Sequence, residues 1–284
     1  MFNYILYRIG RWIVLHVSLG FAYRFAILVS DIKFLFTPAD RIAVIGNLKA
    51  IFPEKTTGQL RRIRRDMVHN FAKYLVDFFR FSVIDKAYIK KQITVINQHY
   101  FDDALAAGKG AIVLTAHLGN WELGGVVLAQ LGYPFWAVAL PHKDKRVNDF
   151  FDSQRLSKGL KVLPLGKAVR HIIRLIKENN MVALVGDRDF TLKGPVSDFF
   201  GKPSIFPEGP AALSLSLKAP IIPGFLIRNP DDTFTLRIEK PIVFSPTGDK
   251  EKDTIALLRT YTAVFEEYIR KYPDQWYMFR RFWL

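Results

Sequence analysis

The sequence predicts an α/β fold with a mixed, mostly parallel central sheet and helices on both faces, preceded by an N-terminal helical extension. Three observations support this prediction. Short runs rich in β-branched and aromatic residues recur from about residue 92, candidate helices lie between most of them, and the first 90 residues show helical patterns only. Such strand–helix alternation is typical of sheets covered on both sides. We therefore divide the chain into a helical segment, residues 1–90, and an α/β domain, residues 91–284.

The expected strands and helices of the α/β domain alternate along the chain. Sites in such sheets lie beyond the carboxyl ends of the strands, so polar residues that directly follow a strand are the first candidates for function. The strands are expected at 93–96, 111–116, 135–140, 162–163, 181–185, 221–227 and 234–244, and the helices at 98–107, 121–131, 145–158, 167–179, 209–218 and 252–271.

The first 90 residues have an amphipathic helical texture with scattered basic residues. Aromatic and aliphatic positions alternate over 2–35, a short helix is expected at 40–52, and a long helix at about 57–82. The apolar stretch 12–28 contains Arg24, which costs about 2.5–3.5 kcal/mol on insertion scales. A shallow membrane span and an interfacial helix are therefore both open, and both imply contact with a membrane.

Composition narrows the function classes. The chain carries 41 Lys and Arg against 26 Asp and Glu, a formal net charge of +15, and its 14% of aromatic residues exclude a disordered chain. Zero cysteines exclude disulfide scaffolds, thiolate zinc sites and cysteine nucleophiles. No phosphate-binding loop, Gly-x-Ser-x-Gly elbow, His-Glu-x-x-His helix or dinucleotide-binding loop is present, so neither a metal nor another cofactor is predicted.

The positive charge favours anionic partners such as membrane lipids, acidic proteins or nucleic acid. Arg61, Arg62, Arg64 and Arg65 form a cluster early in the expected long helix. This cluster is either a solvated helix face or a contact for lipid phosphates or an acidic protein. Because no recognised nucleic-acid-binding motif accompanies the charge, nucleic-acid binding is only a distant alternative, and no nucleic-acid partner is predicted.

The densest group of candidate catalytic residues follows the second expected strand, where 115–125 reads Thr-Ala-His-Leu-Gly-Asn-Trp-Glu-Leu-Gly-Gly. His117 stands where that strand should end, and a turn at Gly119 and Asn120 would let Glu122 fold back toward it. A carboxylate beside an imidazole stabilises the imidazolium and makes the other ring nitrogen a usable base. A His117–Glu122 pair of this kind could deprotonate an alcohol, although a lone histidine at a strand end is more often a hydrogen-bonded structural residue, so both interpretations stay open at this point.

Three further charged residues stand at positions of interest. Asp187 follows the fifth expected strand, where an acidic residue is more often functional than structural. Arg155 lies on an expected helix, where its planar guanidinium suits a phosphate or a carbonyl, with a surface charge as the alternative. Asp189 is a weaker candidate, and an ion pair with Arg188 is its structural alternative.

Glu208 and Gly209 open the expected helix 209–218. Backbone amides at a helix N-terminus suit an anion or the oxyanion of a thioester. Pro210 removes one of these amides. We therefore expect transition-state support here rather than a dedicated phosphate site.

Taken together, these blocks resemble a known family. His117 followed by Glu122 resembles the His-x₄-Asp/Glu signature of the lysophospholipid acyltransferase superfamily, and 116–125 is similar to its lipid A late acyltransferase branch, the lauroyl/myristoyl acyltransferases of Gram-negative bacteria. The resemblance spans nearly the whole chain. Its further blocks are 148–159, 186–189, 199–211 and the closing segment 273–283.

The resemblance implies roles for individual residues. His117 matches the general base and Glu122 its acidic partner, while Arg155 and Asp187 match residues implicated in activity. Pro210 departs from the family pattern, because the wider superfamily usually has Thr or Ser there.

The implied reaction is direct acyl transfer without an acyl-enzyme, from an acyl carrier protein or acyl-CoA to a hydroxyl of an anionic glycolipid, here a lipid A precursor. A lysophospholipid or a phosphatidylinositol mannoside is the alternative acceptor. The implied location is the cytoplasmic face of the inner membrane. An apolar groove for the acyl chain is expected beside His117.

Overall fold

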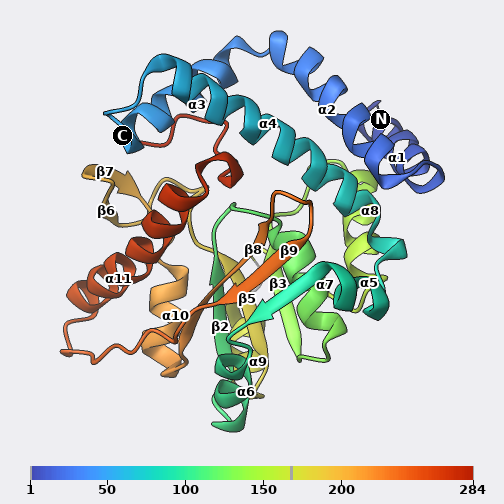
Figure 1. Cartoon of the computed structure of the whole chain (residues 1–284). Helices are drawn as coiled ribbons and strands as arrows, with labels where there is room; N and C mark the ends of the chain where they lie inside the picture. The colour runs from blue at the N-terminus through green and yellow to red at the C-terminus, as the bar shows by residue number, and fades with distance from the viewer. Residues whose placement is uncertain (1, 167–168, 284) are drawn as a thin grey trace.

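A seven-stranded sheet lies at the centre of the molecule (Figure 1). The computed structural model describes residues 2–166 and 169–283. The strands of the sheet are β1 (Ile93–Ile96), β2 (Ala111–Thr115), β3 (Phe135–Ala139), β4 (Lys161–Pro164), β5 (Met181–Val185), β8 (Ile221–Arg228) and β9 (Phe234–Ile238). Their order is β1-β9-β8-β2-β5-β3-β4. Strands β2, β3, β4, β5 and β8 are parallel, while β9 is antiparallel to β8 and parallel to β1, which confirms the predicted mixed, mostly parallel sheet.

Helices cover both faces of this sheet, as predicted. Strand β2 shows why: Ile112 and Leu114 enter one hydrophobic cluster, whereas Ala111 and Val113 enter the other. Helices α6 and α7 pack into the second cluster, and α9, α10 and α11 into the first. These helices and α8 are bounded as α6 (His99–Ala106), α7 (Trp121–Gln130), α8 (Lys145–Leu156), α9 (Val169–Lys177), α10 (Gly209–Leu217) and α11 (Lys250–Lys271).

Residues 2–90 are mainly helical, as expected, but the apolar stretch 12–28 is not one helix. Ser18 interrupts it, because its hydroxyl accepts the N–H of Phe21 at 3.3 Å and caps a new helix. None of the helices in the described ranges combines the length and apolar character needed to cross a membrane. The helices are α1 (Phe2–His16), α2 (Leu19–Leu35), α3 (Pro38–Ile51), α4 (Thr57–Phe79) and α5 (Lys86–Gln92), with a short 3₁₀ turn at Phe81–Val83.

The strands differ from the sequence-based expectations in two places. A two-stranded antiparallel hairpin, β6 (Val196–Phe199) and β7 (Lys202–Ile205), was not predicted, since its strands are short and Pro203 is a poor strand former. The strand expected at 234–244 ends at Ile238, because Pro241 cannot donate to a strand ladder.

Helix α4 crosses above the carboxyl ends of the parallel strands, and the N-terminal helices α1, α2 and α3 lie along it (Figure 1). Its buried side chains Leu60, Met67 and Tyr74 belong to the same cluster as Ile112 and Leu114 of β2. The helical segment and the sheet therefore share one hydrophobic core, and α4 forms the roof over the strand ends where a site is expected.

Candidate active site

His117 and Asp187 follow neighbouring strands at the centre of the sheet. Strands β2 and β5 pair in register with Thr115 opposite Val185, and each of the two residues lies two positions farther along its own chain. The chain leaves β2 toward α7, which covers one face of the sheet, and leaves β5 toward α10, which covers the opposite face. This reversal is a topological switch point, the place in an open α/β sheet where ligands bind.

His117 is paired with Asp187. Its Nδ1 lies 2.6 Å from Oδ1 of Asp187, a fully buried carboxylate, and the indole N–H of Trp276 donates to Oδ2 at 3.0 Å. Burial alone would raise the pKa of Asp187, but the His117 charge and these hydrogen bonds lower it to about 2. The carboxylate is therefore ionised and holds the proton on Nδ1. The side chain of His117 is 17% exposed, and its Nε2 has no hydrogen-bond partner within the described ranges.

Main-chain hydrogen bonds fix the loop that carries His117. The N–H of Tyr277 donates to the His117 carbonyl at 2.9 Å, and the N–H of Gly119 donates to the Gln275 carbonyl at 2.9 Å. Gly119 has a φ of +66°, and a Cβ there would lie 2.1 Å from the Leu226 carbonyl oxygen. Only glycine fits this close approach to β8, so the C-terminal segment and β8 together set the position of the imidazole.

Aromatic rings form a wall beside the imidazole. The Trp121 ring packs edge-to-face against His117 at 5.1 Å between centroids, and Tyr74 of α4 stacks on Trp121 at 4.7 Å. Tyr277 lies 6.0 Å from Trp121 and 5.9 Å from Tyr74. Trp121 therefore forms part of the wall of the site, in contact with both the imidazole and α4.

Glu122 does not pair with His117, so the predicted His117–Glu122 contact was wrong. Both carboxylate oxygens of Glu122 instead accept from Arg155, whose Nε and Nη2 lie 2.8 and 2.6 Å away. Helix α7 begins at Trp121 and carries Glu122 toward α8, where the buried Arg155 needs a carboxylate. Burial alone would lower the pKa of Arg155, but the Glu122 charge raises it above its ordinary value.

Arg155 is occupied by neighbouring carboxylates. Its Nη1 donates to Asp152 at 3.1 Å, so every guanidinium nitrogen already has an acceptor, and the residue is only 6% exposed. This geometry ties α7 to α8 and does not favour the predicted direct grip on a phosphate or a carbonyl.

Asp189 organises its own loop. Its carboxylate accepts backbone N–H groups of Thr191, Lys193 and Gly194 at 2.8, 3.1 and 2.6 Å. Burial alone would raise the pKa of Asp189, but these donors lower it. Arg188 donates instead to the Tyr277 carbonyl, so the alternative Asp189–Arg188 ion pair was also wrong.

Glu208 and Gly209 stand at the start of α10, as predicted, and both are exposed. Glu208 makes no capping hydrogen bond with its side chain. Among the described residues, no hydrogen bond or ion pair joins this turn to His117 or Asp187. Its role in supporting the transition state stays a prediction.

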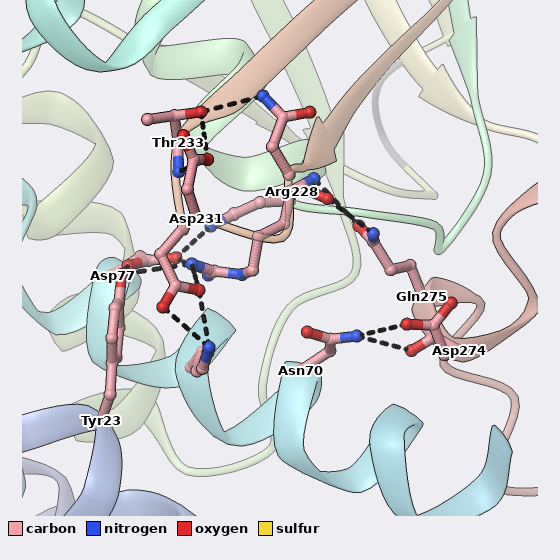
Figure 2. A network of polar contacts seen from close by, with 12 residues as sticks. Tyr23, Asn70, Asp77, Arg228, Asp231, Thr233, Asp274 and Gln275 are labelled. Atoms are coloured by element: carbon pink, nitrogen blue, oxygen red, sulfur yellow. Dashed lines mark hydrogen bonds and ion pairs between the residues drawn. The ribbon is translucent and has the colours of Figure 1, made fainter. Parts of the chain in front are cut away.

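A second buried charge network holds the far end of the same loop, and sequence reasoning missed it (Figure 2). Asp77 of α4 accepts from Tyr23 at 2.6 Å, from the Asn120 amide at 2.8 Å and from Arg228 at the end of β8. The side-chain amide of Gln275 pairs with both backbone groups of Arg228 at 3.0 and 2.9 Å. Burial raises the pKa of Asp77. The sequence offered one signal for this network: Asp77 lies among the aromatic residues of α4. A charge buried there needs a partner, so the position of Asp77 indicated a buried ion pair.

Comparisons with known proteins identify the family. Residues 3–284 match the family described as bacterial lipid A biosynthesis acyltransferase. Phosphatidylinositol mannoside acyltransferases of Mycolicibacterium smegmatis and Mycobacterium tuberculosis are 31% and 29% identical to the chain, over 78% and 76% of it and 72% and 69% of their own lengths.

A lipid A biosynthesis acyltransferase of Haemophilus influenzae is 22% identical over 81% of the chain and 71% of its own length. The crystal structure of a 1-acyl-sn-glycerophosphate acyltransferase from Thermotoga maritima matches with a TM-score of 0.36 and 14% identity, over 86% of this chain and 98% of that one. By its family match across nearly all of its length, the chain belongs to the bacterial lipid A biosynthesis acyltransferases and is an acyltransferase.

Proposed function

We propose that this acyltransferase transfers a fatty acyl group from a thioester donor to a hydroxyl of a membrane glycolipid, with His117 as the general base. One observation carries the proposal: Nδ1 of His117 is held by Asp187, while Nε2 has no partner in the described ranges and the side chain remains partly exposed. A histidine held in this way presents a lone pair on Nε2 to an incoming alcohol.

The reaction proceeds by direct transfer. Nε2 of His117 takes the proton of the acceptor hydroxyl while the hydroxyl oxygen attacks the thioester carbonyl carbon. The tetrahedral intermediate collapses, the carbon–sulfur bond breaks, and the proton on Nε2 passes to the departing sulfur. Asp187 stabilises the imidazolium between these two steps, and Trp276 keeps the carboxylate oriented.

Glu122 has a positioning role in this proposal instead of contacting the imidazole. Its ion pair with Arg155 holds the start of α7, and thus Trp121 beside the imidazole, against α8. Asp187 takes the place of acidic partner to His117.

The donor is an acyl carrier protein or acyl-CoA, both anionic, which suits a chain of net charge +15. The family match supports a lipid A precursor as the acceptor. The relatives that are 31% and 29% identical support a phosphatidylinositol mannoside. Both acceptors are anionic glycolipids, so a glycolipid is the class that we propose, with a lysophospholipid as the comparison substrate.

The N-terminal segment, residues 1–90, provides the contact with the membrane in this proposal. Helix α2 presents an exposed apolar stripe at helical spacing, and a stripe of this kind suits the interfacial zone of a bilayer. The active site then faces lipid on the cytoplasmic side of the inner membrane. The stripe consists of Phe21, Phe25, Leu28, Ile32 and Leu35, which are 54%, 42%, 57%, 51% and 64% exposed.

A transfer assay in mixed micelles tests the proposal. Acyl carrier protein and CoA thioesters are offered with lipid A precursor, phosphatidylinositol mannoside and lysophospholipid, and labelled product is measured. His117→Ala should abolish transfer and leave thermal unfolding cooperative. His99→Ala, which changes an exposed histidine on α6, is the matched control and should keep full activity.

The outcomes separate the base from the acceptor. Near-native transfer by His117→Ala would refute the general-base assignment whatever the acceptor. Transfer only to the lysophospholipid, lost in His117→Ala, would keep the base and overturn the glycolipid acceptor.

A further inference from the structure

A groove of about 510 Å³ lies between α1 and α8, apart from the His117 site. Neither His117 nor Asp187 lines it. Its wall combines arginines and aromatic rings, a lining that suits an anion with an apolar attachment. The residues that matter here are Tyr4, Arg8, Arg11, Trp12, Arg146 and Phe150.

The groove holds positive charge that nearby carboxylates leave unbalanced. Among the described residues, Arg8 and Arg11 take part in no ion pair. The Nε atom of Arg11 is buried without a hydrogen-bond partner. Asp149, the acidic residue of the wall, is engaged by Lys145 at 2.5 Å.

Arg146 brings a third guanidinium, which differs from the other two. It forms an ion pair with Asp144 at 3.0 Å, and its Cζ lies 6.0 Å from the centre of the Tyr4 ring. Arg8 approaches the same ring at 5.9 Å and also donates to the Tyr4 hydroxyl at 3.3 Å. The guanidinium groups of Arg8 and Arg146 therefore both lie beside the Tyr4 ring, at one side of the groove.

Contacts of α1 with its neighbours fix the shape of the groove. The Tyr7 ring packs against Phe150 at 6.2 Å and Phe151 at 5.4 Å on α8. At the other end of α1, Arg80 donates to the Val14 carbonyl. A preformed site avoids part of the ordering cost of binding.

An apolar edge adjoins the arginines. Ile5, Ile9 and Trp12 recur at helical spacing along α1 and are 44%, 50% and 63% exposed. Arg8 and Arg11 alternate with them in sequence, so charge and apolar surface meet along one helix. A free phosphate needs only the charge, whereas a phospholipid headgroup uses both the charge and the apolar edge.

From these observations we infer that the α1–α8 groove is a binding site for the phosphate of an anionic lipid headgroup. Arg8 and Arg11 take the phosphate oxygens, and Trp12 packs on the apolar part that follows. This site is separate from the acyl-transfer chemistry, since its residues are not those that bind or activate the reacting groups.

Calorimetric titration with short-chain phosphatidylglycerol below its micelle concentration, and separately with inorganic phosphate, tests the inference. The double variant Arg8→Gln/Arg11→Gln should weaken lipid binding about 10- to 100-fold. The matched control Arg170→Gln/Arg259→Gln removes the same charge from exposed positions on α9 and α11 and should bind as the native protein does. His117→Ala should also bind normally, so a failure of the proposed reaction leaves this test intact.

Three results would overturn the inference. Equal binding by the native protein and the Arg8/Arg11 variant would show that the lipid binds elsewhere. An equal loss of lipid binding in the control variant would show that the weaker binding comes from the lower net charge of the protein. Inorganic phosphate that binds as tightly as the lipid would make the groove a site for free phosphate.

Discussion

Two buried charge systems hold opposite ends of the loop 117–120, and they differ in how completely their polar atoms are satisfied. At one end His117 meets Asp187, and at the other Asn120 meets Asp77. Both aspartates are almost fully buried, and each receives hydrogen bonds from side chains far away in the sequence.

The Asp77 system is closed. Its carboxylate accepts from Tyr23, Asn120 and Arg228, and Arg228 is held in turn through its backbone by Gln275. Both carboxylate oxygens of Asp77 accept hydrogen bonds from other protein side chains. Such a network specifies how α2, α4 and β8 dock.

The His117 system is open. Asp187 has both oxygens satisfied, but the imidazole keeps Nε2 without a partner in the described ranges and stays partly exposed. A shifted aspartate pKa is found in both systems, raised for Asp77 and lowered for Asp187. An unfilled hydrogen-bonding position, rather than a perturbed pKa, therefore distinguishes the pair that we propose as reactive from the structural one.

The largest effect should come from breaking the closed network. Asp77→Ala leaves Arg228 buried without its carboxylate, so the free energy of unfolding should fall by about 3–5 kcal/mol. Activity per folded molecule should stay within a few-fold of native. Urea unfolding followed by tryptophan fluorescence measures the free energy of unfolding. The rate of acyl transfer at low temperature measures the activity per folded molecule.

Asp231→Ala is the control for this variant, because Asp231 is an exposed loop residue that bonds Thr233. Its loss of stability should be far smaller than that of Asp77→Ala. An equally small loss in Asp77→Ala would show that the network does not hold the helices on the sheet.

The next effect tests the open pair. Asp187→Asn should lower kcat about 100- to 1,000-fold, or about 3–4 kcal/mol in the activation barrier, because the imidazolium loses its negative partner. Adding Asp187→Asn to His117→Ala should cost little more, since the two residues act as a unit. Single-turnover rates measure this. Additive losses would mean that Asp187 acts independently of the imidazole.

Much of the sheet was predictable because its strands carry their own signal. The apolar runs at β2 and β5 are short, continuous and followed by polar residues, and both strands lie where the sequence placed them. The hairpin β6–β7 lacks that signal. Its turn relies on Phe200 and Gly201, both in the left-handed region, and a non-glycine residue there is hard to foresee.

The partner of His117 was predictable only in part. Glu122 is close in sequence and carries the family signature, so local reasoning favoured it. Asp187 is 70 positions away and reaches His117 only because β2 and β5 pair in register. Asp77 and Arg228 are 151 positions apart and meet for a similar reason, through the docking of α4 over β8. Long-range pairing of this kind depends on topology, which a single sequence specifies weakly.

The stability of the protein should depend on pH through Asp187. The pKa of Asp187 is about 2 in the folded protein against an ordinary value of 3.8, so the folded state favours its ionised form. That preference contributes on the order of 2 kcal/mol above pH 4, and the contribution is lost as the pH falls from 4 through 2. Urea unfolding at pH 2, 3, 4 and 5 should therefore show the native protein losing more stability than Asp187→Asn. Parallel losses would place the stabilising charge elsewhere.

The smallest effect concerns the second oxygen of Asp187. Trp276→Phe removes the indole N–H that donates to Oδ2, so the pKa of Asp187 should rise and kcat should fall about 3- to 10-fold, or about 1 kcal/mol. Trp283→Phe is the matched control, because it removes a 3.0 Å indole hydrogen bond to the Phe199 carbonyl in the same aromatic cluster. If the two variants lose activity equally, Trp276 supports the fold rather than the carboxylate. A different result is that only Trp276→Phe loses activity, and that its stability also falls at a higher pH than that of the native protein. In that case the orientation of the Asp187 carboxylate contributes to the chemistry, and the catalytic unit consists of His117, Asp187 and Trp276 of the C-terminal segment.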